Sequence, residues 1–151
     1  MVRSRSTVKP QPGLLLEPFV LSQLMSVLIG GVVEGSQVSG PEFALTSWLA
    51  VVNGATPTEL SRDLGMAPTT LSAMIDRLVR KGQVERARHP EDGRSYVLQL
   101  TAKGRRTNVR NVRRFATAIA AVRGNLETDE ERVLAALRSL EAALRKTLAD
   151  A

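Results

Sequence analysis

Two proline-containing helix start signals divide the middle of this chain into short helices, and no other feature constrains the fold as much. Ser39-Gly-Pro-Glu42 and Thr56-Pro-Thr-Glu59 each join a hydroxyl cap to a proline near the first turn and a glutamate three residues after the cap. Gly65 and Gly82 suit the left-handed position that ends a helix. The signals predict three helices, over residues 41–52, 57–64 and 68–81.

The third of these helices has two different faces. Leu71, Met74, Ile75 and Leu78 recur at steps of three and four, as on the buried side of a helix. The opposite face carries small and polar residues, namely Thr69, Thr70, Ser72, Ala73, Asp76 and Arg77. This helix is therefore expected to pack on a core and to present a polar surface outward.

The periodicity changes to two after Gly82, which is typical of strands. In the segment 95–100, Tyr96, Leu98 and Leu100 alternate with their neighbours, and residues 84–88 form a similar short segment. Six polar residues, 89–94, separate the two and are rich in turn formers. The pair predicts a β-hairpin with an exposed tip.

Helices are also predicted at both ends of the chain. An apolar, little-charged stripe from Phe19 to about Val33 predicts a helix after a break at Glu17-Pro18, largely buried either in its own core or against a second copy of the chain. Thr101 is expected to cap a long helix that ends at Asn125, with the apolar seam Val109, Val112, Ala116, Ile119 and Val122. A last helix begins with Glu127, Asp129, Glu130 and Glu131 and carries Val133, Leu137, Leu140, Leu144 and Leu148.

Composition excludes many other classes of protein. The chain has no cysteine and one histidine, His89, which as a lone ligand is more typical of a solvated loop than of a metal site. There is no nucleophile–base pair, phosphate loop or paired-carboxylate site, so neither an enzyme nor a cofactor is expected. No uninterrupted apolar run reaches about 18 residues, so no membrane-spanning helix and no membrane partner are expected.

The positive charge is concentrated in one part of the chain. The net charge is +6, but residues 57–123 hold fourteen basic and six acidic residues, a local sum of +8. Such a segment favours a polyanionic partner, although a merely basic, solvated surface has the same composition.

The elements predicted for residues 56–100 follow the order of a known DNA-binding motif. Two short helices joined through Gly65-Met66-Ala67 match a helix-turn-helix, whose second helix enters the major groove of DNA. Thr69, Thr70 and Ser72 near its start can reach base edges or phosphates. The alternative is that they are ordinary solvated helix positions.

Five motifs in this order resemble the MarR family of winged-helix transcriptional regulators. The resemblance runs from about Leu14 to Leu148. The motifs are Thr56-Pro-Thr-Glu-Leu60, Arg77-Leu-Val-Arg-Lys-Gly82, Val84-Glu-Arg86, His89-Pro-Glu-Asp-Gly-Arg94 and Leu100-Thr-Ala-Lys-Gly104.

The resemblance implies a mainly α fold with a small β-hairpin wing. A winged helix-turn-helix would occupy about residues 41–100, and dimerisation helices would occupy about 14–35 and 101–149. Together they would form a single domain over residues 14–151, preceded by a flexible arm over residues 1–13. The apolar stripes of the terminal helices favour packing on an identical chain, although an elaborated monomer remains the alternative.

The resemblance also implies the site. The DNA-binding residues would be Thr69, Thr70, Ser72, Arg77, Arg86, Arg94 and Lys103, with Asp92 orienting the wing through arginines such as Arg86. Two residues depart from the family pattern: His89 stands where aspartate is common, and Ala67 stands where a serine-type cap is usual.

The implied function is sequence-specific binding of double-stranded DNA by a homodimer that reads a pseudo-palindromic operator as a ligand-responsive, cytoplasmic repressor. A small-molecule effector would lodge between the dimerisation and DNA-binding parts. Phe43 and Trp48 are candidates to line that pocket, although both also suit the core. The alternative function is a winged helix that docks on an acidic protein without reading DNA.

Overall fold

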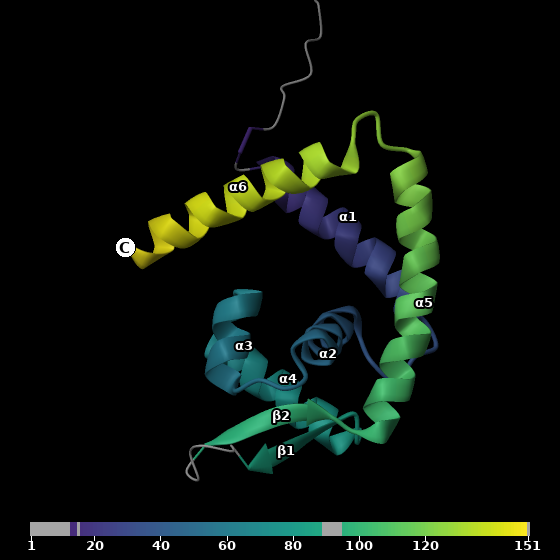
Figure 1. Ribbon diagram of the computed structural model, residues 1–151, viewed down its shortest axis with the longest axis vertical. Helices are drawn as coiled ribbons and strands as arrows, with labels where there is room; N and C mark the ends of the chain where they lie inside the picture. Colours follow the sequence, from purple (N-terminus) through teal and green to yellow (C-terminus); the bar gives the residue numbers. More distant parts are fainter. Residues whose placement is uncertain (1–12, 15, 89–94, 151) are drawn as a thin grey trace, which may run out of the picture. The chain divides into compact units, whose positions relative to one another are not determined.

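The computed structural model describes residues 13–14, 16–88 and 95–150, and within them the chain is mainly helical with one β-hairpin (Figure 1). This confirms the predicted fold class. Chain contacts divide it into two units, residues 1–112 and 113–151, and the boundary falls within a helix. The elements are α1 (Leu16–Val33), α2 (Gly40–Val52), α3 (Pro57–Leu64), α4 (Pro68–Arg80), β1 (Val84–Arg88), β2 (Tyr96–Leu100), α5 (Ala102–Gly124) and α6 (Glu130–Ala149).

The predicted caps set the ends of α2 and α3. Glu42 Oε2 accepts a hydrogen bond from the Ser39 N–H at 2.8 Å, and Glu59 Oε2 accepts one from the Thr56 N–H at the same distance. Each glutamate therefore reaches back to the cap residue of its own helix. At the other end, α3 stops at Gly65, whose φ of 62° is the left-handed conformation that glycine adopts without strain.

The first unit has an apolar core at the centre of the helix-turn-helix. The four residues predicted for the inner face of α4 are all buried, at 0–3% exposure. They meet side chains from α2, α3 and the hairpin that are equally buried. These are Leu45, Leu49, Leu60 and Leu98. Burial of these apolar side chains stabilises the packing of one face of α4 on the core, and the opposite face is exposed to solvent.

β1 and β2 pair antiparallel, with Val84 opposite Leu100 and Arg88 opposite Tyr96. The linker between α2 and α3 extends this hairpin, because Ala55 exchanges two backbone hydrogen bonds with Leu98, at 2.8 and 3.2 Å. The sequence analysis did not predict this bridge. The hairpin tip, with His89, Asp92 and Arg94, lies outside the described residues, as does most of the N-terminal arm.

Hydrogen bonds at the base of the hairpin join the residues that follow α4 to the start of α5. Gly82 has a φ of 66°, and the Gln83 N–H then bonds the Leu78 carbonyl at 2.9 Å, which closes α4. The Thr101 hydroxyl donates to the Gly82 carbonyl at 2.7 Å and accepts from the Gly104 N–H at 2.9 Å. Thr101 thus caps α5, as predicted.

α1 differs from its prediction in two ways. The helix begins at Leu16, so Pro18 lies in its first turn, where a proline is tolerated, and does not break it. In addition, α1 is long and apolar enough to cross a membrane by length and composition, contrary to expectation. A helix that packs against a second protein chain can have the same length and apolar composition. Within a single chain the helix is mostly exposed, with only Val32 and Val33 buried, so of the two expected forms of burial its own core does not supply it.

The first half of α5 buries polar residues and exposes apolar ones. Thr107, Asn108 and Asn111 are at most 6% exposed, whereas Val109 and Val112 of the predicted seam are 51% and 43% exposed. The polar side packs on the core of its own chain through hydrogen bonds. The apolar seam remains on the surface of the single chain.

The second unit comprises the end of α5 and α6. Asp129 caps α6, so Glu127 precedes the helix and was wrongly placed in its first turns. No residue of α6 is buried, and four of its leucines are exposed, namely Leu134, Leu137, Leu144 and Leu148.

Candidate nucleic-acid interface

The outer face of α4 presents the residues predicted to read base edges. Thr69, Thr70 and Ser72 are all exposed and lie in the first turns of the helix, opposite its buried leucines. Ala67 occupies the cap position and its side chain makes no capping hydrogen bond, as its methyl group dictates. The N-terminus of α4 therefore offers backbone N–H groups that no Ala67 side chain satisfies.

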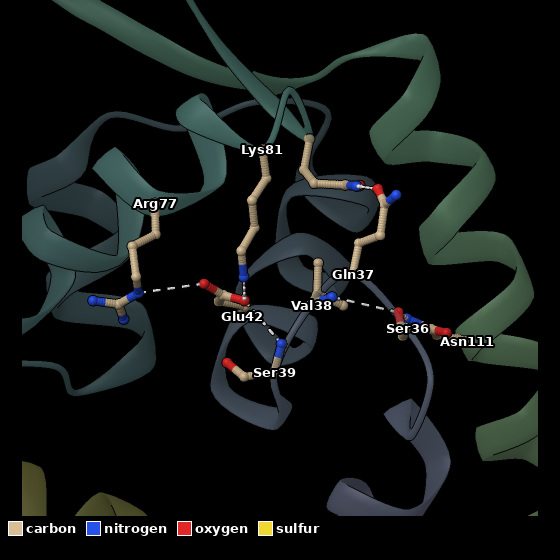
Figure 2. Close-up of polar contacts among 9 residues, drawn as sticks. Ser36, Gln37, Val38, Ser39, Glu42, Arg77, Lys81 and Asn111 are labelled. Atoms are coloured by element: carbon tan, nitrogen blue, oxygen red, sulfur yellow. Dashed lines mark hydrogen bonds and ion pairs between the residues drawn. The ribbon is translucent and has the colours of Figure 1, made fainter.

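Arg77 points back toward the protein in this structure. Its Nε lies 3.4 Å from Glu42 Oε1, and Lys81 Nζ donates to Glu42 Oε2 at 2.6 Å (Figure 2). Glu42 is 1% exposed, whereas the two cations remain 46% and 38% exposed. The predicted DNA-facing arginine is thus half-exposed and shares one buried carboxylate with a lysine one turn along α4.

The electrostatics of Glu42 follow from these contacts. Burial by itself raises the pKa of this carboxyl group, but hydrogen bonds from Lys81, the Ser39 N–H and Arg77 favour the charged form. The pKa of Glu42 is consequently lower than the ordinary value of 4.5. Glu42 is therefore ionised near neutral pH and holds the side chains of Lys81 and Arg77 by charge.

Arg86 lies between α4 and the hairpin. Its Nη2 donates to Asp76 Oδ1 at 2.6 Å, and its guanidinium lies 5.4 Å from the centre of the Tyr96 ring. The hydrogen bond to Asp76 raises the pKa of Arg86. The expected partner, Asp92, is outside the described residues, and Asp76 on α4 performs an orienting role that the sequence analysis did not assign to it.

Lys103 joins the beginning of α5 to the end of α4. Its Nζ donates to the Lys81 carbonyl at 2.7 Å, at the negative end of the α4 dipole. The side chain is nevertheless exposed. The structure thus places Arg77, Arg86 and Lys103 around α4, while Arg94 lies outside the described residues.

The loop between α1 and α2 makes hydrogen bonds with α5 and with Gln83, the residue that lies between α4 and β1 (Figure 2). Asn111 of α5 donates to the Ser36 hydroxyl at 3.0 Å, and the Gln83 amide donates to Gln37 Oε1 at 3.0 Å. The loop leads directly into Ser39 and Glu42. Sequence analysis identified Glu42 only as part of a cap, because no local pattern reveals its partner Lys81 on another helix.

Phe43 and Trp48 have different environments. Phe43 is 5% exposed and belongs to the core. Trp48 is half-buried, and its Nε1 is buried with no hydrogen-bond acceptor among the residues that the structure describes. Among the described residues, one cavity of about 380 Å³ lies between α3, α4 and Tyr96 and another of about 230 Å³ lies between α2, β2 and α5, and neither is lined by Phe43 or Trp48.

This geometry agrees with that of known proteins. The sequence profile of the MarR family matches residues 38–96. The HTH-type transcriptional repressor YetL of Bacillus subtilis (strain 168) is 29% identical over 120 residues, which cover 78% of this chain and 72% of YetL. The multiple antibiotic resistance protein MarR of Escherichia coli (strain K12) is 29% identical over 85 residues, which cover 56% of this chain and 59% of MarR.

Solved structures match over more of the chain. A mutant of E. coli MarR complexed with operator DNA superposes with a TM-score of 0.69 and 25% identity, covering 88% of this chain and 91% of that one. The PcaV transcriptional regulator of Streptomyces coelicolor, in complex with its natural ligand, gives a TM-score of 0.71 at 25% identity, covering 95% of this chain and 98% of that one. The chain is therefore similar to regulators of the MarR family, in sequence over residues 38–96 and in fold over most of its length.

Proposed function

We propose that this protein is a transcriptional regulator that binds double-stranded DNA in a sequence-specific manner, with α4 in the major groove and the hairpin beside it. One observation supports this most strongly: a buried inner face fixes α4, while Thr69, Thr70 and Ser72 stand exposed at its N-terminal end. The cations Arg77, Arg86 and Lys103 lie farther along α4, toward its C-terminal end and the hairpin, and suit phosphate contacts. Arg94 and Asp92 are assigned to the wing tip in the same proposal.

The regulator acts as a homodimer. The exposed apolar residues of α1 and the apolar seam of α5 support this, because a single chain leaves them in water. The dimerisation helices are accordingly assigned to about residues 14–35 and 101–149, on either side of a winged helix over about 41–100. Two copies of α4 then lie about one duplex turn apart, roughly 34–36 Å, and read mirrored half-sites.

Repression controlled by a small molecule completes the proposal. YetL is named a repressor, and PcaV was solved with its natural ligand. The buried Nε1 of Trp48, which has no acceptor among the described residues, is a donor that an effector's oxygen would satisfy, and Phe43 lies in the core on the same helix. The protein works in the cytoplasm, with no catalytic activity or cofactor of its own.

Selection of duplexes from a random pool tests the DNA-binding function. The expected result is an enriched sequence with two mirrored half-sites, bound by the dimer. Substituting Thr70 with alanine is expected to alter base preference at one position of each half-site by about 1–3 kcal/mol. Enrichment of no sequence, together with binding to an acidic protein, would instead support a docking module.

A further inference from the structure

Glu42 is a buried negative charge at the beginning of α2 that is compensated by groups on two other parts of the chain. Its carboxylate accepts from the Ser39 N–H, from Lys81 at 2.6 Å and from Arg77 at 3.4 Å. A carboxylate that is only 1% exposed requires such compensation, because burial of an unpaired charge is costly.

Two cations share this single negative charge. Lys81 makes the shorter contact, and the 3.4 Å separation from Arg77 is long for a hydrogen bond. Arg77 is also the more exposed of the two side chains. Lys81 and the Ser39 N–H are sufficient to compensate Glu42, so Arg77 can leave without exposing an unpaired buried charge.

Arg77 also lies on the part of α4 that faces DNA in the proposed function. Thr70, Ala73 and Arg77 follow one another at steps of three and four and therefore share one side of the helix. A planar guanidinium on that side is well suited to a phosphate oxygen. Glu42 and the DNA backbone thus compete for the same arginine.

We propose that Arg77 exchanges between Glu42 and a DNA phosphate, and that Glu42 thereby limits the sequence-independent affinity of the recognition helix for DNA. Lys81 is the permanent counter-ion of Glu42, and Arg77 is the exchangeable one. Glu42 is a positioning residue in this scheme, since it acts on DNA only through Arg77. The inference rests on the proposed DNA-binding function.

Removing the charge of Glu42 tests the competition. In Glu42→Gln the amide oxygen still accepts from the Ser39 N–H, but the attraction for Arg77 is lost. We expect about fivefold tighter binding to a random-sequence duplex, the usual limit for one partly exposed ion pair. The slope of log affinity against log salt between about 50 and 200 mM KCl should steepen by up to about 0.9, which corresponds to one phosphate.

Glu59→Gln is the matched control. Glu59 occupies the same position of the capping box in α3 and likewise accepts from the backbone of its cap residue, Thr56. Its replacement changes the net charge equally, but its recorded hydrogen bonds are to Thr56 and reach no cation of α4. We expect the salt slope of Glu59→Gln to equal that of the wild type.

A charge-neutral variant separates the competition from folding and from net charge. Glu42→Gln combined with Lys81→Met removes the buried charge and its counter-ion together and frees Arg77 at an unchanged net charge. This double variant should also bind random DNA more tightly with a steeper slope. Adding Arg77→Ala should abolish that gain. If Glu42→Gln alone does not fold, the double variant decides the question.

The outcomes distinguish this inference from the proposed function. A wild-type protein that binds no duplex at low salt overturns the proposed function, and the role of Glu42 with it. A wild-type protein that binds duplex DNA, with slopes unchanged in both Glu42 variants, overturns only the exchange of Arg77. An equal steepening in Glu59→Gln, or a gain that survives Arg77→Ala, overturns it as well.

Discussion

Glu42 and Glu59 show how the same local motif acquires different roles. Both are the third residue of a helix and both bond the N–H of their cap. Only Glu42 is buried, and Lys81, just after α4, donates to it at 2.6 Å. The difference lies entirely in what packs over each residue and not in the motif.

Low pH should reduce the contribution of Glu42 to the stability of the folded protein. Its pKa is lowered in the folded state, so the stability it contributes is present above about 4.5 and is lost as the pH falls through the folded-state pKa. Glu42→Gln is expected to lower the free energy of unfolding by about 1–2 kcal/mol at neutral pH, and the deficit should shrink in acid. Urea unfolding at about pH 7 and pH 3 measures this, with Glu85→Gln as an exposed control. A deficit that is constant with pH would contradict the assignment.

Gly104 is a second residue whose role depends on its surroundings. It is buried in the first turn of α5, and a Cβ at this position would overlap the carbonyl group of Gln83. Gly104→Ala should force α5 away from the base of the hairpin and cost about 3 kcal/mol. Thermal unfolding measures the loss, and Gly124→Ala, where a Cβ meets nothing, provides the control. Equal stability of the two variants would exclude the close approach.

At the scale of elements, α4 begins with a weak cap. Ala67 has an extended backbone, with φ −59° and ψ 137°, and its side chain makes no hydrogen bond. A serine there can accept from the first N–H groups of α4, so Ala67→Ser should raise the free energy of unfolding by about 1 kcal/mol. Chemical denaturation measures the gain, and Ala73→Ser, in mid-helix, should show none. No gain in Ala67→Ser would indicate that the N-terminus of α4 is satisfied in another way.

At the scale of the whole molecule, the terminal helices leave apolar surface exposed. Phe19 and Leu24 of α1 are 60% and 63% exposed, which is unfavourable for a chain that stays alone in water. Phe19→Glu should therefore shift the protein from dimer to monomer and weaken binding to a two-half-site operator at least about tenfold. Sedimentation equilibrium and operator titration measure both effects. Val51→Glu, on an exposed residue of α2, is the control; a monomeric wild type would refute the proposed homodimer.

Local signals were sufficient to predict most of the helix-turn-helix. The caps at Ser39 and Thr56, the glycine at 65 and the apolar spacing of α4 act within a few residues, so the chain itself displays them. The period of two likewise revealed β1 and β2. The start of α1 was misjudged because a proline is equally compatible with a break and with a first turn.

The tertiary structure alone decided which charged residues act together. Arg77 was identified as a DNA-facing residue from its motif, yet it contacts Glu42, which lies 35 positions away. Arg86 bonds Asp76 of α4, a partner that the sequence analysis did not name, and Ala55 joins the hairpin from a linker. Periodicity and caps report the conformation of neighbouring residues, whereas an ion pair between helices depends on how their surfaces meet. The sequence therefore determined the elements and the resemblance to the MarR family, and packing determined which cations pair within the protein and which remain exposed.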